Sequence, residues 1–210
     1  MRTYGQYCAL ARALDVVGDR WTLLIVRELG LQGPSRYTDL RHGLPGIATN
    51  MLADRLREME EAGIVRREEA PPPVATTLFS LTERGEELMP VLYALGRWGS
   101  PLMGERGEED EFRSHWLKYP LEQLFADADP DEPPVTLQLR AGDAPMIVET
   151  SDGAIRARPG TAEHPDAIIT GEPEAVIGLL RGTIDLRAAK REGVRVEGDA
   201  KALARVRPRD

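Results

Sequence analysis

The stretch GIATNMLADRLREMEEAGIV, residues 46–65, decides the fold that this sequence predicts. Leu52, Leu56 and Met59 recur at the spacing of one helix face, so we expect an amphipathic helix over residues 48–62 with that side buried. The outward side carries four residues near the first turns: Thr49, Asn50, Ala53 and Arg57. The helix therefore presents one side to a core and the other to solvent or to a partner.

Three further helices are expected before this one. The first covers residues 7–17, and the second covers residues 20–29 behind Asp19 as its N-cap. Apolar residues at helical spacing in these two segments are Leu10, Ala13, Leu14, Val17, Trp21, Leu24, Ile25 and Leu29. A short helix over residues 36–42 then leads into the turn Gly43-Leu44-Pro45-Gly46. Two helices joined by a brief glycine-containing turn are typical of a helix-turn-helix.

A β-hairpin wing is expected after this motif. Strand-like residues 64–67 and 76–81 flank a proline-rich loop, and the tip, residues 70–75, lacks Lys and Arg, so minor-groove insertion is not expected. The next helix opens near Thr82. It carries Leu88, Leu92, Leu95 and Trp98 on one face, which we interpret as a dimerisation surface. The alternative is that this face packs on its own domain.

The second half of the chain predicts a separate α+β domain. A charged linker, residues 104–111, separates the halves. We assign residues 1–104 to DNA binding and dimerisation, 105–133 to a linker and connecting helix, and 134–210 to a smaller α+β domain. Strands are expected over residues 135–140, 146–150, 154–158 and 167–170, helices over 172–180 and 185–192, and a closing segment over 199–206.

Double-stranded DNA is the expected partner of the first domain. Asn50 can pair with adenine and Arg57 with guanine, while Thr49 and the small Ala53 allow close approach to base edges. Phosphate contacts are expected from Arg36, Tyr37 and Thr38, through side chains and the helix N-terminus, and from Arg66 and Arg67 at the wing base. The alternatives are an ordinary solvated helix face and surface salt bridges.

Composition limits the other functions. The net charge is −8, and most of the excess acid lies in the second half, so DNA affinity must come from placed arginines and dimerisation. Three dispersed histidines, His42, His115 and His164, fit no catalytic or metal motif, and no cofactor, metal or catalytic site is expected. Without a spanning segment or signal peptide, we expect a cytoplasmic protein and no membrane partner.

The order of motifs over about residues 5–102 resembles the HxlR family of bacterial winged helix-turn-helix regulators. The motifs are Cys8, GDRWTLLI (18–25), RYTDL (36–40), GIA (46–48), EEAGIV (60–65), LTERG (81–85) and Trp98-Gly99. The resemblance implies homodimers on an inverted repeat, with terminal helices packing across the two-fold axis. It also implies that Cys8 could act as a thiol sensor, the alternative being a buried, inert cysteine.

Residues 165–203 are similar to the sterol-carrier-protein fold, which encloses an apolar cavity between a sheet and its helices. The similarity is carried by PDAIITGE (165–172), AVIGLLRG (175–182) and GVRVEGD (193–199). It implies a sensor for a small apolar ligand, lined by Ile177, Leu180, Ile184 and Leu186, or else a filled core that only supports the dimer. The alternative function is a lipid- or metabolite-binding carrier whose first domain mainly dimerises.

Overall fold

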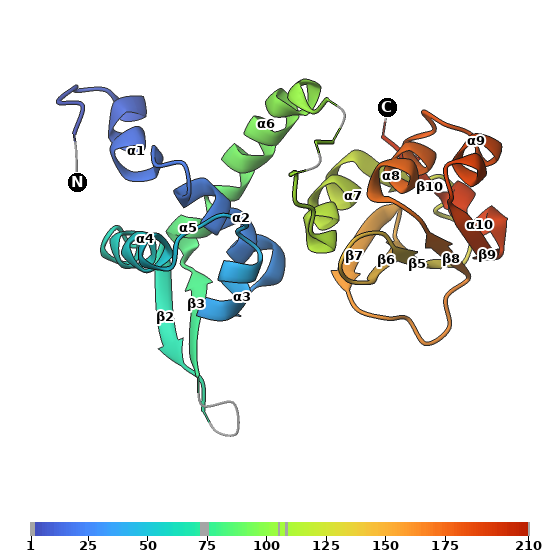
Figure 1. The fold of residues 1–210 in the computed structure, drawn as a ribbon, viewed down its shortest axis with the longest axis horizontal. Helices are drawn as coiled ribbons and strands as arrows, with labels where there is room; N and C mark the ends of the chain where they lie inside the picture. The colour runs from blue at the N-terminus through green and yellow to red at the C-terminus, as the bar shows by residue number, and fades with distance from the viewer. Residues whose placement is uncertain (1–2, 72–75, 105, 108, 210) are drawn as a thin grey trace. The chain divides into compact units, whose positions relative to one another are not determined.

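The helix-turn-helix and its wing lie in the first of two units into which the chain divides, residues 1–111 (Figure 1). The computed structural model describes residues 3–71, 76–104, 106–107 and 109–209. The elements of this unit are α1 (Ala9–Val17), α2 (Thr22–Gln32), β1 (Ser35–Arg36), α3 (Tyr37–His42), α4 (Thr49–Glu61), β2 (Val65–Glu69), β3 (Thr77–Leu81), α5 (Glu83–Glu86), α6 (Met89–Gly99) and a 3₁₀ turn, Ser100–Leu102. Most of the proline-rich tip predicted at 70–75 falls outside the described residues.

The core of the first unit joins α2, α3 and α4. Ile25, Leu29, Leu40, Leu52 and Leu56 are almost fully buried in one cluster. The three residues predicted for the inner side of α4 are all buried, which confirms the helical wheel of that segment. Burial of each such side chain contributes roughly 1.5–3 kcal/mol, so this shared core fixes how the helices pack.

Two predicted apolar stripes are wrong in part. Leu24 is 36% exposed, and α1 leaves Leu10 67% and Leu14 41% exposed, burying only Ala11. Helical periodicity identifies an apolar face but does not tell whether the same chain covers it. The exposed face of α1 therefore lacks a covering element within the described part of its own unit.

The helix expected after Thr82 is divided in two. The Thr82 hydroxyl accepts a hydrogen bond from the Gly85 amide at 3.1 Å and caps the short α5, after which α6 begins at Met89. A side chain on Gly85 would strike the backbone carbonyl of Ile64, so glycine lets α5 lie against the start of the wing. Figure 1 shows the β2–β3 hairpin projecting from one end of the unit and α1 and α6 at the other.

The second unit, residues 112–210, is a curled sheet covered by short helices. Its elements are a 3₁₀ turn (Ser114–Leu117), α7 (Lys118–Leu124), β4 (Phe125–Asp127), β5 (Thr136–Arg140), β6 (Met146–Ser151), β7 (Ala154–Pro159), β8 (Ala167–Thr170), α8 (Pro173–Arg181), α9 (Leu186–Arg191), β9 (Arg195–Gly198), α10 (Ala200–Arg205) and β10 (Val206–Pro208). The strand order is β10-β4-β7-β6-β5-β8-β9, antiparallel except for the β5–β8 pair. Sequence patterns did not predict the short strands β1, β4, β9 and β10.

The chain enters the second unit earlier than the predicted boundary at residue 134. The Ser114 amide donates to the Asp143 carboxylate at 2.8 Å, and the buried Ser114 hydroxyl donates to the Ala141 carbonyl at 2.9 Å. Leu117, Leu121 and Phe125 are buried in the core of this unit. Residues 112–133, which the sequence analysis placed in a linker and connecting helix, thus form part of the folded unit.

A buried ion pair closes the second unit near the end of the described chain. The Arg205 guanidinium donates to both oxygens of Asp127, at 2.6 and 2.7 Å, and to the Pro133 carbonyl at 3.0 Å. The hydrogen bonds from Arg205 hold the pKa of Asp127 below its usual range. Because the folded pKa is depressed, the resulting stability is present above the unfolded pKa of about 3.9 and is lost as pH falls through the folded value.

Replacing Arg205 by methionine should destabilise the second unit. The Asp127 side chain is only 3% exposed, so its carboxylate would lose a charged partner while remaining buried. We expect a loss of about 3–5 kcal/mol in the free energy of unfolding, measured by urea denaturation and by faster hydrogen exchange in β4 and β10. Arg207→Met, on the exposed neighbouring arginine, is the control, and equal stability of the two variants would contradict this role.

No helix within the described ranges is long and apolar enough to span a membrane.

Candidate nucleic-acid interface

The outward face of α4 is the centre of the candidate interface. Thr49, Asn50, Ala53 and Arg57 are all exposed, and they occupy the first three turns of the helix. Ala48 precedes the helix in an extended conformation and provides no side-chain cap. The four side chains are therefore accessible together at the end of the helix that usually reaches base edges in the major groove.

Asp54 holds Arg57 on this face. One carboxylate oxygen of Asp54 lies 2.8 Å from the Arg57 guanidinium, and both side chains remain largely exposed. An exposed pair of this kind contributes less than about 1 kcal/mol to stability. Its effect is to restrict the direction of the arginine, since the carboxylate accepts from one edge of the guanidinium and leaves other donors available.

Tyr37 joins the start of α3 to the start of α4. Its hydroxyl donates a hydrogen bond to the Thr49 carbonyl, and its ring packs against the core of the first unit. This contact brings Arg36 and Thr38, which are exposed, near the amino-terminal turn of α4. Sequence analysis expected Tyr37 to contact phosphate, whereas the structure gives it a positioning role that no sequence pattern indicated.

The amino terminus of α3 is occupied by its own carboxylate. Asp39 accepts a hydrogen bond from the Arg36 amide at 3.1 Å. A carboxylate at a helix N-terminus takes the place that an anion would occupy there. Any phosphate contact in this region therefore comes from the side chains of Arg36 and Thr38, and the expected contribution of the helix terminus is a correction.

The two wing arginines are both close to carboxylates. Arg66 lies 3.1 Å from Glu68 and also donates to the Ser80 hydroxyl at 3.1 Å, and Arg67 lies 3.9 Å from Glu60. Both side chains are exposed. The salt-bridge alternative is thus present in the structure, and the wing strands offer phosphate less positive charge than their arginines alone would suggest.

A buried carboxylate supports the turn between α3 and α4. Glu28 in α2 is fully buried, lies 2.7 Å from the Arg27 guanidinium and accepts from the Gln32 amide at 2.8 Å. Arg27 also donates to the Gly43 carbonyl at 3.3 Å, and a side chain on Gly43 would overlap the Glu28 carboxylate. Sequence analysis missed Glu28, although a glutamate inside the apolar run of α2 is a signal of a partnered buried charge.

The predicted dimerisation face divides into two parts. Leu88 and Leu92 pack against the core of their own domain, whereas Leu95 and Trp98 are 49% and 71% exposed. Other exposed apolar residues on α1, on α6 and directly after α6 are Tyr7, Leu10, Leu14, Val91, Leu102 and Met103. Both alternatives of the sequence analysis therefore hold, each for half of the predicted residues.

The remaining predicted sites lie elsewhere. Cys8 is exposed at the N-cap of α1, which rules out the alternative of a buried thiol. Leu180 is buried in the second unit, where Ile177, Ile184 and Leu186 pack against the same core. No group of three or more metal-ligating His, Cys, Asp or Glu side chains occurs among the residues that the structure describes.

Comparisons with known proteins bear on the first unit. A family model described as HxlR-like helix-turn-helix matches residues 16–106. An uncharacterized HTH-type transcriptional regulator of Synechocystis sp., sll1512, is 38% identical over 96 residues, covering 46% of this chain and 70% of its own. The regulator YvaP of Bacillus subtilis is 34% identical over 89 residues, covering 42% and 82%.

This chain belongs to the HxlR-like helix-turn-helix family. Membership places it among helix-turn-helix transcriptional regulators. A solved structure of an HxlR-like regulator, the reduced form of YodB from B. subtilis, is 30% identical, with a TM-score of 0.41, and covers 49% of this chain and all of its own. The HxlR-like match ends at residue 106, so it leaves the second unit unassigned.

Proposed function

We propose that this protein is a transcriptional regulator that reads DNA sequence through the outward face of α4. The observation that carries the proposal is the joint exposure of Thr49, Asn50, Ala53 and Arg57 on the second helix of a helix-turn-helix. Asn50 offers both a donor and an acceptor for adenine, and Arg57, held by Asp54, offers a donor pair for guanine. Arg36 and Thr38 contact the flanking phosphates and set the register.

We expect Asn50→Ala and Arg57→Ala each to weaken specific binding by about 1–3 kcal/mol, because each removes contacts to one base. The measurement is a fluorescence-anisotropy titration of the full-length protein against the DNA upstream of its own gene and a scrambled duplex, at about 150 mM salt. Glu61→Ala, exposed at the far end of α4, is the matched control and should bind as the wild type does.

Equal, weak binding of both duplexes by the wild type would refute the regulator proposal. Unchanged affinity of both alanine variants for the upstream duplex would refute the role of α4 while leaving DNA binding in place.

The regulator acts as a homodimer on an inverted repeat in this proposal. The support is the apolar surface on α1 and α6, which lie at the same end of the first unit (Figure 1). Exposed apolar residues are ordinary when scattered, but a continuous patch marks a contact surface. Trp98 is the natural centre of this surface, since a tryptophan at the middle of an interface carries a large share of the binding energy.

Trp98→Asp should therefore convert the dimer to a monomer. We expect the dimer dissociation constant to rise by about 100-fold or more in sedimentation-velocity experiments, because a charge would be desolvated in an apolar interface. Leu124→Asp places the same charge on an exposed leucine in the second unit and is the control. A Trp98→Asp protein that dimerises with wild-type affinity would overturn this assignment.

Two expectations of the sequence analysis stay predictions. Cys8 is an exposed residue on the same helix as the proposed dimer surface, so oxidation there would act on dimerisation. The sterol-carrier-like ligand pocket in the second unit is disfavoured by the packing of Ile177, Leu180 and Ile184 against a continuous core, which supports the filled-core alternative. The carrier function depends on that pocket and is not our preferred function.

A further inference from the structure

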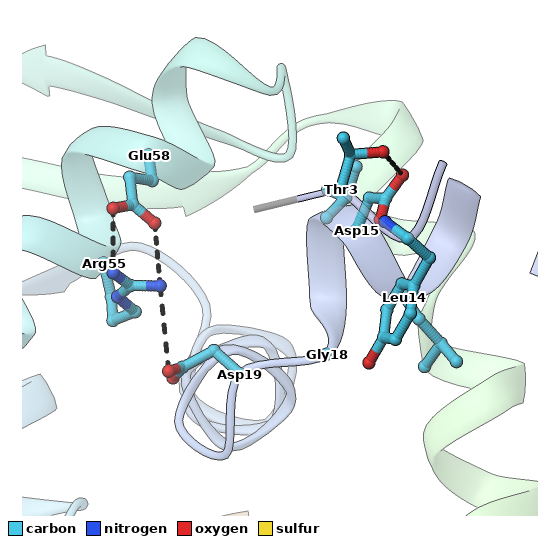
Figure 2. Close-up of a pocket in the computed structure, with 9 residues that line it drawn as sticks. Thr3, Leu14, Asp15, Gly18, Asp19, Arg55 and Glu58 are labelled. Carbon is cyan, nitrogen blue, oxygen red and sulfur yellow. Dashed lines mark hydrogen bonds and ion pairs between the residues drawn. The ribbon is translucent and has the colours of Figure 1, made fainter. Parts of the chain in front are cut away.

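A cleft of about 640 Å³ lies beside the inner side of α4, away from the face proposed to read DNA (Figure 2). Its volume is within the range of small-molecule sites. One wall comes from the amino-terminal segment and α1, and the other comes from α4 and the turn before α2. The lining residues that matter for recognition are Tyr4, Leu14, Asp15, Asp19, Arg55 and Glu58.

Asp15 holds the amino-terminal wall in place. Its carboxylate accepts from the Thr3 hydroxyl at 2.9 Å and from the Tyr4 amide at 2.8 Å, and Arg12 lies 3.6 Å away. The hydrogen bond from the Tyr4 amide, with smaller contributions from Thr3 and Arg12, keeps the pKa of Asp15 below its usual value. The carboxylate therefore stays ionised and keeps Tyr4 beside the cleft, where Leu14 adds a second apolar surface.

Arg55 is the one cation among the residues that line this cleft. Glu58 receives it at 2.7 and 2.8 Å, whereas Asp19 lies 3.7 Å away and uses its other oxygen to accept from the Trp21 amide at 2.9 Å. Figure 2 shows Arg55 between Glu58 and Asp19, across the cleft from Asp15. Three carboxylates thus line the space with a single guanidinium, and Arg12 offsets Asp15 from outside the lining.

We propose that this cleft binds a small organic cation with an apolar body, of the arylalkylamine class. The ammonium group would donate to Asp19 and Glu58, whose attraction for a cation is strengthened by partial removal from water. The aryl group would lie against Tyr4 and Leu14. An anion of the same size is disfavoured by the excess of carboxylates.

The site connects ligand binding to the DNA-reading helix. Glu58 and Arg55 belong to α4, so a ligand that takes Glu58 as its partner weakens the contact between Glu58 and Arg55 and, with it, the link from Arg55 to Asp19 before α2. A ligand shifts an equilibrium only by its different affinity for the two states, and this exchange of partners provides such a difference. This regulatory consequence rests on the proposed role of α4, whereas ligand binding itself does not.

Isothermal titration calorimetry of the full-length protein without DNA tests the site. The probe is phenethylammonium, with phenylacetate and phenethyl alcohol as the anionic and neutral controls of matched size. We expect saturable binding of the ammonium compound alone, reduced about tenfold or more by Glu58→Gln and by Asp19→Asn. Glu61→Gln, which removes a carboxylate of α4 outside the cleft, should leave the affinity unchanged.

Three results would overturn the proposal: no saturable binding of phenethylammonium, equal binding of the three probes, or full affinity in both cleft variants. Circular dichroism of each variant shows whether it is folded, and Glu58→Gln retains the size of the side chain. Because the titration contains no DNA, its outcome is independent of whether the protein proves to bind an operator.

Discussion

The placement of α4 depends on the buried carboxylate of Glu28. This side chain lies under the turn that joins α3 to α4, at a point where Gly43 leaves room for it. Isolated burial of a charge is costly, and here Arg27 and Gln32 compensate it with short hydrogen bonds. Because Arg27 also donates to the Gly43 carbonyl, the ion pair joins α2 directly to the turn. Apolar packing brings the helices together, and this polar contact specifies the turn between them.

The first unit reads DNA, in this account, with few free positive charges. Arg57, Arg66 and Arg67 each have a carboxylate nearby, so long-range attraction to phosphate is weak. Affinity then comes from directed contacts and from doubling of the interface by the homodimer. Sequence selectivity benefits from this arrangement, because weak non-specific attraction leaves a larger difference between the operator and other DNA.

Much of the fold followed from local patterns in the sequence. The inner side of α4 and the wing strands were predicted because their periodicity agrees with their burial, and the outward residues of α4 were predicted from the same wheel. Leu10, Leu14 and Leu24 were misjudged, since periodicity does not separate a core face from one that is exposed in the single chain. The strands β1 and β4 were missed because two or three residues carry too little pattern, and they exist only through pairing with distant segments. The same holds for the site: Tyr37 acts through a contact with Thr49, twelve residues away, which no local pattern contains.

The most direct test of the central claim is a binding selection from a randomised duplex library, carried out with the wild type, Asn50→Ala and Arg57→Ala. The account predicts that the wild type enriches an inverted repeat and that each variant loses base preference at one symmetric pair of positions while keeping it elsewhere. Unchanged base preferences in both variants, with affinity lowered equally for every sequence, would show that α4 contacts only the DNA backbone and would contradict the account.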